Sequence, residues 1–398
     1  MDGDRSYLWW AMPTLHYRRS AVKNLMLKIA LIRQRYAHDG GAERFVSRAL
    51  DALKSRAVRP TLVTREWHGA EGFDVIRCDP FYLGRLWRDW SFARAACRAV
   101  RRGLFDLVQS HERIACCDIY RAGDGVHREW LKQRARAQGP LARFATALNP
   151  YHYYVRAAEK RLFASLRLKA VICNSRMVRD EIRRYFKVPD NRLRVIYSGV
   201  DTRAYHPDLK SHRAQVRSRH GIPDAATLFL FVGSGFERKG MAALLEAMAA
   251  LPANTFLLVV GRDRHVSRFQ AVSEKRGMAQ RVIFLGAKQD VKPYYGAADA
   301  LVLPTLYDPF PNVALEAMAS GLPVITSLKS GAAELIENGR NGFACDALDV
   351  PTLITHLRAV TPASAKILGE RARATVEPMS LDRMSLALLD LYNSLLRT

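Results

Sequence analysis

Residues 227–240 read Thr-Leu-Phe-Leu-Phe-Val-Gly-Ser-Gly-Phe-Glu-Arg-Lys-Gly. The first six residues are mostly apolar and predict a buried strand, and an apolar helical pattern starts at Met241. Glycines in the loop between them, beginning with Gly233, allow a ligand to approach the backbone closely. The helix that follows presents unpaired N–H groups and a partial positive charge, to which Arg238 and Lys239 add two full charges. The loop therefore suits a diphosphate.

This loop differs from two common phosphate-binding motifs. Its glycine spacing does not match the G-x-G-x-x-G dinucleotide fingerprint, and it lacks the Gly-Lys-Ser/Thr of a Walker A loop. Taken alone, it could equally be a glycine-rich turn with two solvated cations.

Short apolar runs alternate with helical segments on both sides of this loop. Such alternation predicts parallel sheets built from right-handed β-α-β units. The expected C-terminal strands are Thr227–Val232, Thr255–Val260, Val282–Leu285, Ala300–Leu303 and Pro323–Thr326. The expected C-terminal helices are Met241–Ala250, Val266–Arg276, Val291–Ala297, Val313–Ser320, a piece near Ala332–Glu337 and a final helix over Leu381–Leu396.

The N-terminal half repeats this scheme. Its expected strands are Lys28–Arg33, Arg59–Val63, Leu107–Gln109, Ala170–Cys173 and Leu193–Ile196, and its clearest helices are Ala42–Leu53 and Phe92–Arg102. A chain of 398 residues is too long for one ordinary core, so we predict two Rossmann-like, doubly wound α/β domains that face each other across a cleft.

The domain boundaries follow from composition. A cluster of Gly, Pro and Asp places the joint between the domains at residues 198–207. The expected units are an N-terminal extension (1–27), which we interpret as disordered or as a start-site artefact, an N-terminal domain (28–200), a C-terminal domain (201–378) and a C-terminal helix (379–398) that crosses back to the N-terminal domain.

A second motif, at residues 308–317, reads Asp-Pro-Phe-Pro-Asn-Val-Ala-Leu-Glu-Ala. A predicted strand ends at Leu303 and a helix begins near Asn312, a residue type favoured at helix N-caps. Asp308 is therefore expected in the mouth of the crevice, with Glu316 just over one turn into the helix. Two such carboxylates can hold different hydroxyls of one ligand, as a carboxylate holds a ribose diol. A helix-terminal Asp with an exposed Glu would also fit this spacing.

A third motif, Gly40-Gly41-Ala42-Glu43-Arg44, follows the first predicted strand. A glycine pair at a helix start suits approach by a phosphate or a sugar. Alone it is a weak signal, since many turns contain two glycines.

The charge is large and uneven. The formal net charge is +24, and residues 1–200 hold 39 Lys and Arg against 19 Asp and Glu. Such a field attracts an anionic partner, for which nucleic acid, anionic lipid and phosphorylated glycan all qualify. A genome that favours Arg for solubility would explain the net charge as well, but explains the asymmetry less readily.

The compartment is inferred from three absences in the sequence. No apolar run is long enough to span a bilayer, and no convincing signal peptide begins the chain. The six cysteines form no C-x-x-C pair, so we expect buried free thiols rather than a disulfide framework. These features favour the cytoplasm.

Taken together, the motifs resemble glycosyltransferase family 4, the retaining enzymes of GT-B fold, and within it most of all the bacterial lipopolysaccharide core glucosyltransferases. The resemblance is strong from about residue 228 to 340 and looser before 200. The matching residues are Gly40–Arg44, Asn174-Ser175, Ser198–Asp201, Phe231–Gly233, Arg238–Gly240, Val260-Gly261, Asp308–Glu316 and Gly331–Leu335.

The resemblance implies a donor site for a nucleotide sugar, with UDP-glucose the expected donor and no bound metal or other cofactor. Arg238 and Lys239 would bind the diphosphate and stabilise its growing charge, and Glu316 would bind the ribose. Asp308 would lie near the donor sugar, although the family usually has Glu there. The implied donor-binding set is Gly40, Gly41, Gly233, Arg238, Lys239, Leu285, Phe310, Pro311, Asn312, Val313 and Glu316.

The resemblance also implies roles in the N-terminal domain. Many family members carry a His near the donor sugar at the position that Asp124 occupies here. The core glucosyltransferases carry Asp at that position, as this chain does. The implied catalytic set is Asp124, Asp308, Arg238 and Lys239, and the implied acceptor-binding residues are Glu43, Arg44 and His127.

The expected function is transfer of a hexose, with glucose favoured, to a lipopolysaccharide core or another cell-envelope glycan. Cations interleaved with Trp and Tyr in the basic half suggest a lipid-linked or phosphorylated acceptor and docking on the cytoplasmic face of the inner membrane. Two alternatives are a sugar-nucleotide epimerase of the same architecture and a basic protein that binds anionic polymers or membranes. The sequence has no recognisable nucleic-acid-binding motif, so we expect no nucleic-acid partner.

Overall fold

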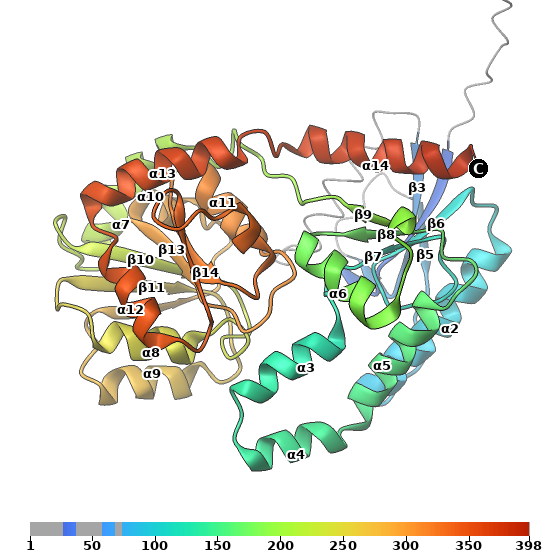
Figure 1. Cartoon of the computed structure of the whole chain (residues 1–398), viewed down its shortest axis with the longest axis horizontal. Helices are drawn as coiled ribbons and strands as arrows, with labels where there is room; N and C mark the ends of the chain where they lie inside the picture. The colour runs from blue at the N-terminus through green and yellow to red at the C-terminus, as the bar shows by residue number, and fades with distance from the viewer. Residues whose placement is uncertain (1–26, 37–57, 68–73, 398) are drawn as a thin grey trace, which may run out of the picture.

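The protein forms two α/β lobes in the computed structural model, and the chain crosses between them near residue 200 and again near residue 380 (Figure 1). The prediction of two Rossmann-like lobes is therefore confirmed. The residues that the structure describes are 27–36, 58–67 and 74–397. The predicted extension, the helix Ala42–Leu53, and Gly40, Gly41, Glu43 and Arg44 lie outside the described residues.

The N-terminal lobe is built on a parallel sheet with strand order β5-β3-β1-β6-β7-β8-β9. Side chains of a strand alternate between the two faces of its sheet, so Ala30 and Ile32 pack under α2 and α6, whereas Ile29 and Leu31 pack against α14. The strands are β1 (Leu27–Ile32), β3 (Val58–Thr64), β5 (Asp74–Arg77), β6 (Leu107–Ser110), β7 (Ile119–Arg121), β8 (Ala170–Cys173) and β9 (Leu193–Val195), with a small separate pair, β2 (Arg35–Tyr36) and β4 (Glu66–Trp67). The helices of this lobe are α2 (Gly84–Arg102), α3 (His127–Arg136), α4 (Pro140–Leu148), α5 (Pro150–Phe163) and α6 (Arg176–Phe186).

The C-terminal lobe has a second parallel sheet, in the order β12-β11-β10-β13-β14-β15. Its strands are covered on both faces, which explains the continuous apolar run of β10. The strands are β10 (Thr227–Val232), β11 (Thr255–Val260), β12 (Val282–Gly286), β13 (Ala300–Leu303), β14 (Val324–Ser327) and β15 (Gly342–Cys345). The helices are α7 (Arg213–Arg219), α8 (Met241–Ala249), α9 (Val266–Lys275), α10 (Lys292–Ala297), α11 (Asn312–Ala319), α12 (Val350–Arg358), α13 (Pro362–Val376) and α14 (Leu381–Leu396).

The last helix crosses back to the N-terminal lobe, as expected (Figure 1). Met384, Leu388 and Leu391 of α14 pack with the N-terminal strands, and the Tyr392 hydroxyl donates a hydrogen bond to Oε1 of Gln109 at 2.8 Å. Where the chain leaves the N-terminal lobe, the amide of Val200 donates a hydrogen bond to the carbonyl of Met379 at 2.9 Å. The two crossings therefore lie side by side.

One expectation about cysteine is wrong. Cys97 and Cys116 form a disulfide, whereas Cys78, Cys117, Cys173 and Cys345 are free and buried. The bond joins α2 to the loop that follows β6, two segments that sheet order brings together. The 19-residue spacing of the pair carries no motif, so the sequence pattern could not reveal it.

Polar groups at the junction of the lobes meet around one lysine. Lys329 Nζ lies 2.9 Å from Oε1 of Glu129 and 3.0 Å from Oε1 of Glu181, so a C-terminal cation neutralises two N-terminal carboxylates. Both carboxylate side chains are almost fully buried. Burial raises the pKa of Glu181 even though Tyr307 and Lys329 act in the opposite direction.

We expect Lys329→Met to lower the free energy of unfolding by about 2–3 kcal/mol at pH 8, because it leaves two buried carboxylates without a counter-ion. The side chain of Lys329 is 30% exposed, so the loss is smaller than for a fully buried pair. Without the lysine the folded-state pKa of Glu181 rises further above its unfolded value of 4.5. A group with a raised folded pKa gains protons on folding, so the deficit should shrink as pH falls from 8 to 5.

Urea unfolding at both pH values measures this effect, with the exposed Lys366→Met as the matched control. A deficit equal at pH 5 and pH 8 would contradict the assigned role of Glu181.

Candidate active site

A cavity of about 1310 Å³ lies between the two lobes. Loops at the carboxyl ends of β10, β11 and β13 form its C-terminal side, as expected for ligand loops of doubly wound sheets. The loop after β7 and parts of α3 and α5 form its N-terminal side. The predicted loop at 233–240 and the first part of the second motif, residues 308–313, thus meet at one cleft.

The glycine-rich loop takes a conformation that needs glycine. Gly233 has a φ of 148° and Gly235 a φ of 77°, both in the left-handed region. Gly240 is the N-cap of α8, and a Cβ there would lie 1.9 Å from the carbonyl oxygen of Pro304. The carbonyl of Arg238 accepts a hydrogen bond from the amide of Leu306 at 2.9 Å, so this loop is bonded to the loop after β13.

Asp308 links the two motifs directly. Its carboxylate accepts a hydrogen bond from Lys239 Nζ, and Arg238 Nη1 lies 3.4 Å from Oδ2. Burial lowers the pKa of Lys239, with Asp308 opposing this effect. Burial would raise the pKa of Asp308, but Lys239 and Arg238 outweigh it and lower that pKa. The acid expected to face a sugar is therefore also the counter-ion of the two cations.

The segment Phe310, Pro311, Asn312 and Val313 lines the cleft as expected. Pro311, rather than Asn312, is the N-cap of α11. Glu316 lies below this surface, is 1% exposed, and accepts a hydrogen bond from the Tyr295 hydroxyl at 3.1 Å.

Leu285 and Glu316 do not contribute to the cavity surface in this structure. Leu285 packs against the apolar core, whereas Ala287, Lys288 and Gln289 reach the cavity from the same loop. The predicted roles of Leu285 and Glu316 in donor binding stay predictions.

Asp124 lies on the N-terminal side of the cleft, opposite Arg238. Its side chain is 52% exposed, and Oδ2 lies 3.4 Å from Nη1 of Arg113. Its position inside the cleft would raise its pKa, but the positive charges of Arg113, Arg33 and Arg238 outweigh this and lower it. Asp124 is therefore an anion between the two lobes.

His127 lines the same side at the start of α3. Its Nε2 lies 3.0 Å from Nδ1 of His152, and its amide donates a hydrogen bond to Oε1 of Glu159 at 2.9 Å. Burial, followed by the positive charge of Arg113, lowers the pKa of His127 to about 3. The imidazole is therefore neutral near pH 7.

Sequence reasoning gave no role to several residues that line the cleft. Asn174, 2% exposed, follows β8 and donates from Nδ2 to the carbonyl of Gly123 at 3.4 Å. Its place in the Asn174-Ser175 motif at a strand end was a usable signal. Arg113 and Tyr307 had none, because their partners come from distant segments.

Metal-ligand clusters and membrane-spanning helices are both absent from the described residues. Within residues 27–36, 58–67 and 74–397, no group of three or more His, Cys, Asp or Glu side chains is placed to hold a metal ion. No helix in these ranges is long and apolar enough to cross a membrane.

Comparison with known proteins agrees with this architecture. Residues 39–204 match the model described as Glycosyltransferase Family 4, and residues 212–373 match the model described as Glycosyl transferases group 1. The chain therefore belongs to the glycosyltransferases, with a family 4 domain followed by a group 1 domain, and it is a transferase of GT-B fold.

Among individual relatives, the chain is similar to the lipopolysaccharide glucosyltransferase WaaG of Escherichia coli K12, with 26% identity over 79% of this chain and 84% of the relative. The lipopolysaccharide core biosynthesis glycosyltransferase LpsE of Rhizobium meliloti is 27% identical over 79% and 83%.

Solved structures show the same fold. A crystal structure of WaaG has a TM-score of 0.80 at 24% identity, covering 92% of this chain and 99% of that one. Anabaena HepE in complex with UDP-glucose has a TM-score of 0.68 at 20% identity, covering 92% and 100%.

We expect Tyr307→Phe to lower the free energy of unfolding by about 1–3 kcal/mol. The Tyr307 hydroxyl accepts a hydrogen bond from the amide of Val126 at 2.9 Å and donates one to Oε2 of Glu181 at 2.6 Å, so its loss leaves the buried Val126 amide unpaired and Glu181 bonded to Lys329 alone. Urea unfolding measures the change. Tyr82→Phe, which removes an exposed hydroxyl bonded to Arg35, is the control and should change stability by less than about 0.5 kcal/mol.

Proposed function

We propose that this protein is a retaining transferase that moves a hexose from a nucleotide sugar, with UDP-glucose the favoured donor, to a lipopolysaccharide core or another cell-envelope glycan. The convergence of the glycine-rich loop and the 308–313 segment on one interlobe cavity carries the proposal. The similarity to WaaG and LpsE, both named for lipopolysaccharide synthesis, supports the acceptor class. The HepE complex with UDP-glucose supports the donor.

In this proposal the diphosphate binds at the start of α8. The N–H groups of the loop and the charges of Arg238 and Lys239 face the phosphates there. As the bond from the sugar to the phosphate breaks, negative charge grows on the leaving diphosphate, and the two cations stabilise it. Glu316 takes the ribose hydroxyls, while its Oε2 also accepts the hydrogen bond from the Tyr295 hydroxyl.

Asp308 and Asp124 flank the position of the transferred sugar. Asp308 holds Lys239 in place and presents its free oxygen to sugar hydroxyls. Asp124 stands on the acceptor side, near the bond that forms between the acceptor hydroxyl and the anomeric carbon. The acceptor proton passes to the leaving phosphate, which attends the same face of the sugar in a retaining transfer.

We expect Lys239→Ala and Glu316→Ala each to reduce turnover about 10²–10³-fold, because each removes a charged contact with the donor. Both variants should keep the native circular dichroism spectrum. Release of UDP in the presence of acceptor measures turnover, and the exposed residues Lys366→Ala and Glu370→Ala are charge-matched controls. Wild-type activity in both site variants would defeat the assignments, and sugar conversion without any acceptor would indicate an epimerase.

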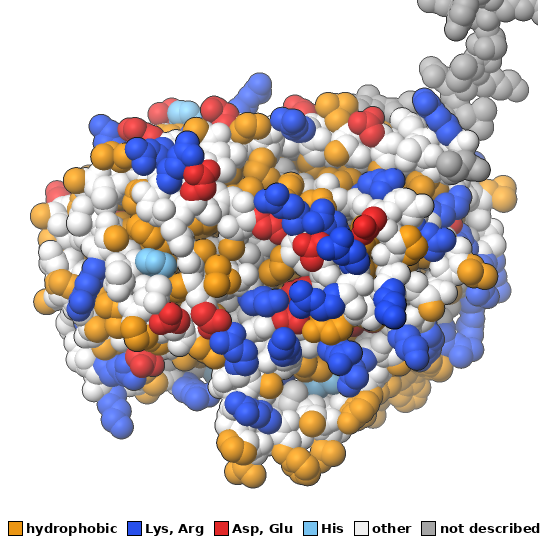
Figure 2. All heavy atoms as spheres, viewed as in Figure 1, with side chains coloured by type: hydrophobic (Ala, Val, Ile, Leu, Met, Phe, Trp, Pro, Cys, Tyr) orange, Lys and Arg blue, Asp and Glu red, His pale blue; other side chains and the backbone are white. Residues whose placement is uncertain are grey.

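We propose further that the protein works on the cytoplasmic face of the inner membrane and receives a lipid-linked acceptor. Helix α4 has no buried residue, and Leu141, Phe144 and Leu148 are 88%, 65% and 61% exposed. In Figure 2 hydrophobic side chains cluster at the lower edge, where Figure 1 places α4, and Lys and Arg side chains gather above them. An apolar helix face beside cations suits an anionic interface.

We expect the protein to co-sediment with vesicles that contain anionic lipid and to bind neutral vesicles at least about tenfold less. Leu141→Glu should reduce binding to anionic vesicles, because it places a carboxylate where an apolar side chain would insert. Ile367→Glu, on an exposed position of α13, is the matched control. Equal binding to neutral and anionic vesicles would count against this docking mode.

A further inference from the structure

The cavity is larger than one donor needs. Small-molecule pockets usually span roughly 300–1,000 Å³, and this cavity has about 1310 Å³. The donor loops occupy its C-terminal side, and the surface continues past Asp124 onto three N-terminal helices. That part is available to a second ligand, which, on the proposed function, is the acceptor.

Five residues form this part, which we name the acceptor wall. They are Arg85 from α2, Trp130 and Arg134 from α3, and Tyr151 and His152 from α5. The wall combines aromatic rings with guanidinium groups and has no carboxylate. Aromatic faces pack against the C–H faces of sugars, and guanidinium groups bind phosphate or carboxylate through parallel hydrogen bonds.

The wall carries uncompensated positive charge. Arg113 and Arg136, which lie nearby, each have a carboxylate partner. By contrast, neither Arg85 nor Arg134 forms an ion pair within residues 27–36, 58–67 and 74–397. Arg85, Arg134 and His152 line the same cavity. Burial lowers the pKa of His152, and the charges of Arg134 and Arg85 lower it further. Such a concentration of like charge favours an anionic ligand.

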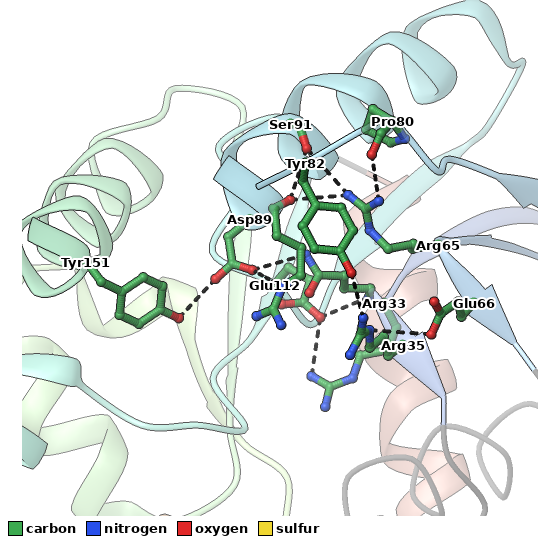
Figure 3. Close-up of polar contacts among 12 residues, drawn as sticks. Arg33, Arg35, Arg65, Glu66, Pro80, Tyr82, Asp89, Ser91, Glu112 and Tyr151 are labelled. Atoms are coloured by element: carbon green, nitrogen blue, oxygen red, sulfur yellow. Dashed lines mark hydrogen bonds and ion pairs between the residues drawn. The ribbon is translucent and has the colours of Figure 1, made fainter. Parts of the chain in front are cut away.

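The wall is also held in place by neighbouring residues. The Tyr151 hydroxyl donates a hydrogen bond to Oδ2 of Asp89 at 2.9 Å, a contact drawn in Figure 3. Asp89 is itself fixed by Arg88 Nε at 2.9 Å. The guanidinium of Arg85 lies over the Tyr151 ring, 4.5 Å from its centroid. The aromatic and the cation are thus positioned before any ligand arrives, which reduces the entropy cost of binding.

We propose that the acceptor wall binds an anionic sugar of the acceptor, with its ring against Trp130 and Tyr151 and its phosphate or carboxylate between Arg85 and Arg134. This inference rests on the proposed transferase function and specifies its acceptor: the sugar that enters the cleft, or the one beside it, carries a negative charge. A neutral glycan lacks the group that the two arginines recognise.

The test uses the full chain saturated with UDP, so that the donor loop is filled and added anions report on the wall. Calorimetric titrations compare glucose 6-phosphate, glucuronate and methyl glucoside. We expect at least one of the two anionic sugars to bind ~10-fold or more tightly than methyl glucoside, and the stronger of the two identifies the recognised group.

Two double variants locate the binding. Arg85→Ala with Arg134→Ala should weaken binding of the preferred anionic sugar ~10–100-fold and leave UDP affinity unchanged. Arg101→Ala with Lys132→Ala removes the same charge from exposed positions of α2 and α3 and should leave both affinities unchanged. In the wild type, the anionic sugar should also shift the imidazole NMR signals of His152.

Three results would overturn the proposal: equal binding of methyl glucoside, unchanged anion binding in the Arg85/Arg134 variant, or the same loss in the control variant. Absence of UDP binding would count against the proposed function. The acceptor wall can still be tested in that case, because the anionic sugars can be titrated into the two double variants without UDP.

Discussion

The buried ion pair between Lys239 and Asp308 joins the two segments on which the C-terminal side of the cleft depends. One partner ends the glycine-rich loop after β10, and the other begins the turn that leads into α11. Because both charges are removed from water, neither can lose its partner cheaply, and the two loops are held in register. On the proposed function, a donor diphosphate would meet cations whose positions are already set by a carboxylate.

The N-terminal side of the cleft is organised differently. Its residues come from helices and loops, and its charges are mostly arginines, of which some are neutralised by buried acids and some are not. Lys329 and Tyr307 of the C-terminal lobe contact Glu129 and Glu181, and these contacts connect this side to the C-terminal lobe. The cleft therefore divides into a C-terminal half fixed by sheet topology and an N-terminal half fixed by side-chain packing.

This division explains what could be predicted from sequence. The strands of both sheets and the motif loops follow from apolar periodicity and glycine placement, which are local, so they were predicted within about a residue or two. Five short strands, β2, β4, β5, β7 and β15, were not predicted. The first two have two residues each, and in the other three, few apolar residues stand between polar residues or beside a glycine. The sequence could not predict the roles of Arg113 and Tyr307 or the Cys97–Cys116 bond, because only tertiary packing brings their partners together. Family resemblance supplied candidate roles for Asp124 and Glu316, which periodicity alone would not have given.

The paired crossings near residues 200 and 380 constrain how the lobes can move. A single connecting segment would allow the lobes to swing in any direction, but here two segments run side by side and are hydrogen-bonded at Val200 and Met379. A Cβ on Gly199 would lie 2.8 Å from the backbone of Leu381, so the segments are too close to slide past each other. Any relative rotation of the lobes must therefore keep these two segments together, so the double link limits the directions in which the two sides of the cleft can move apart.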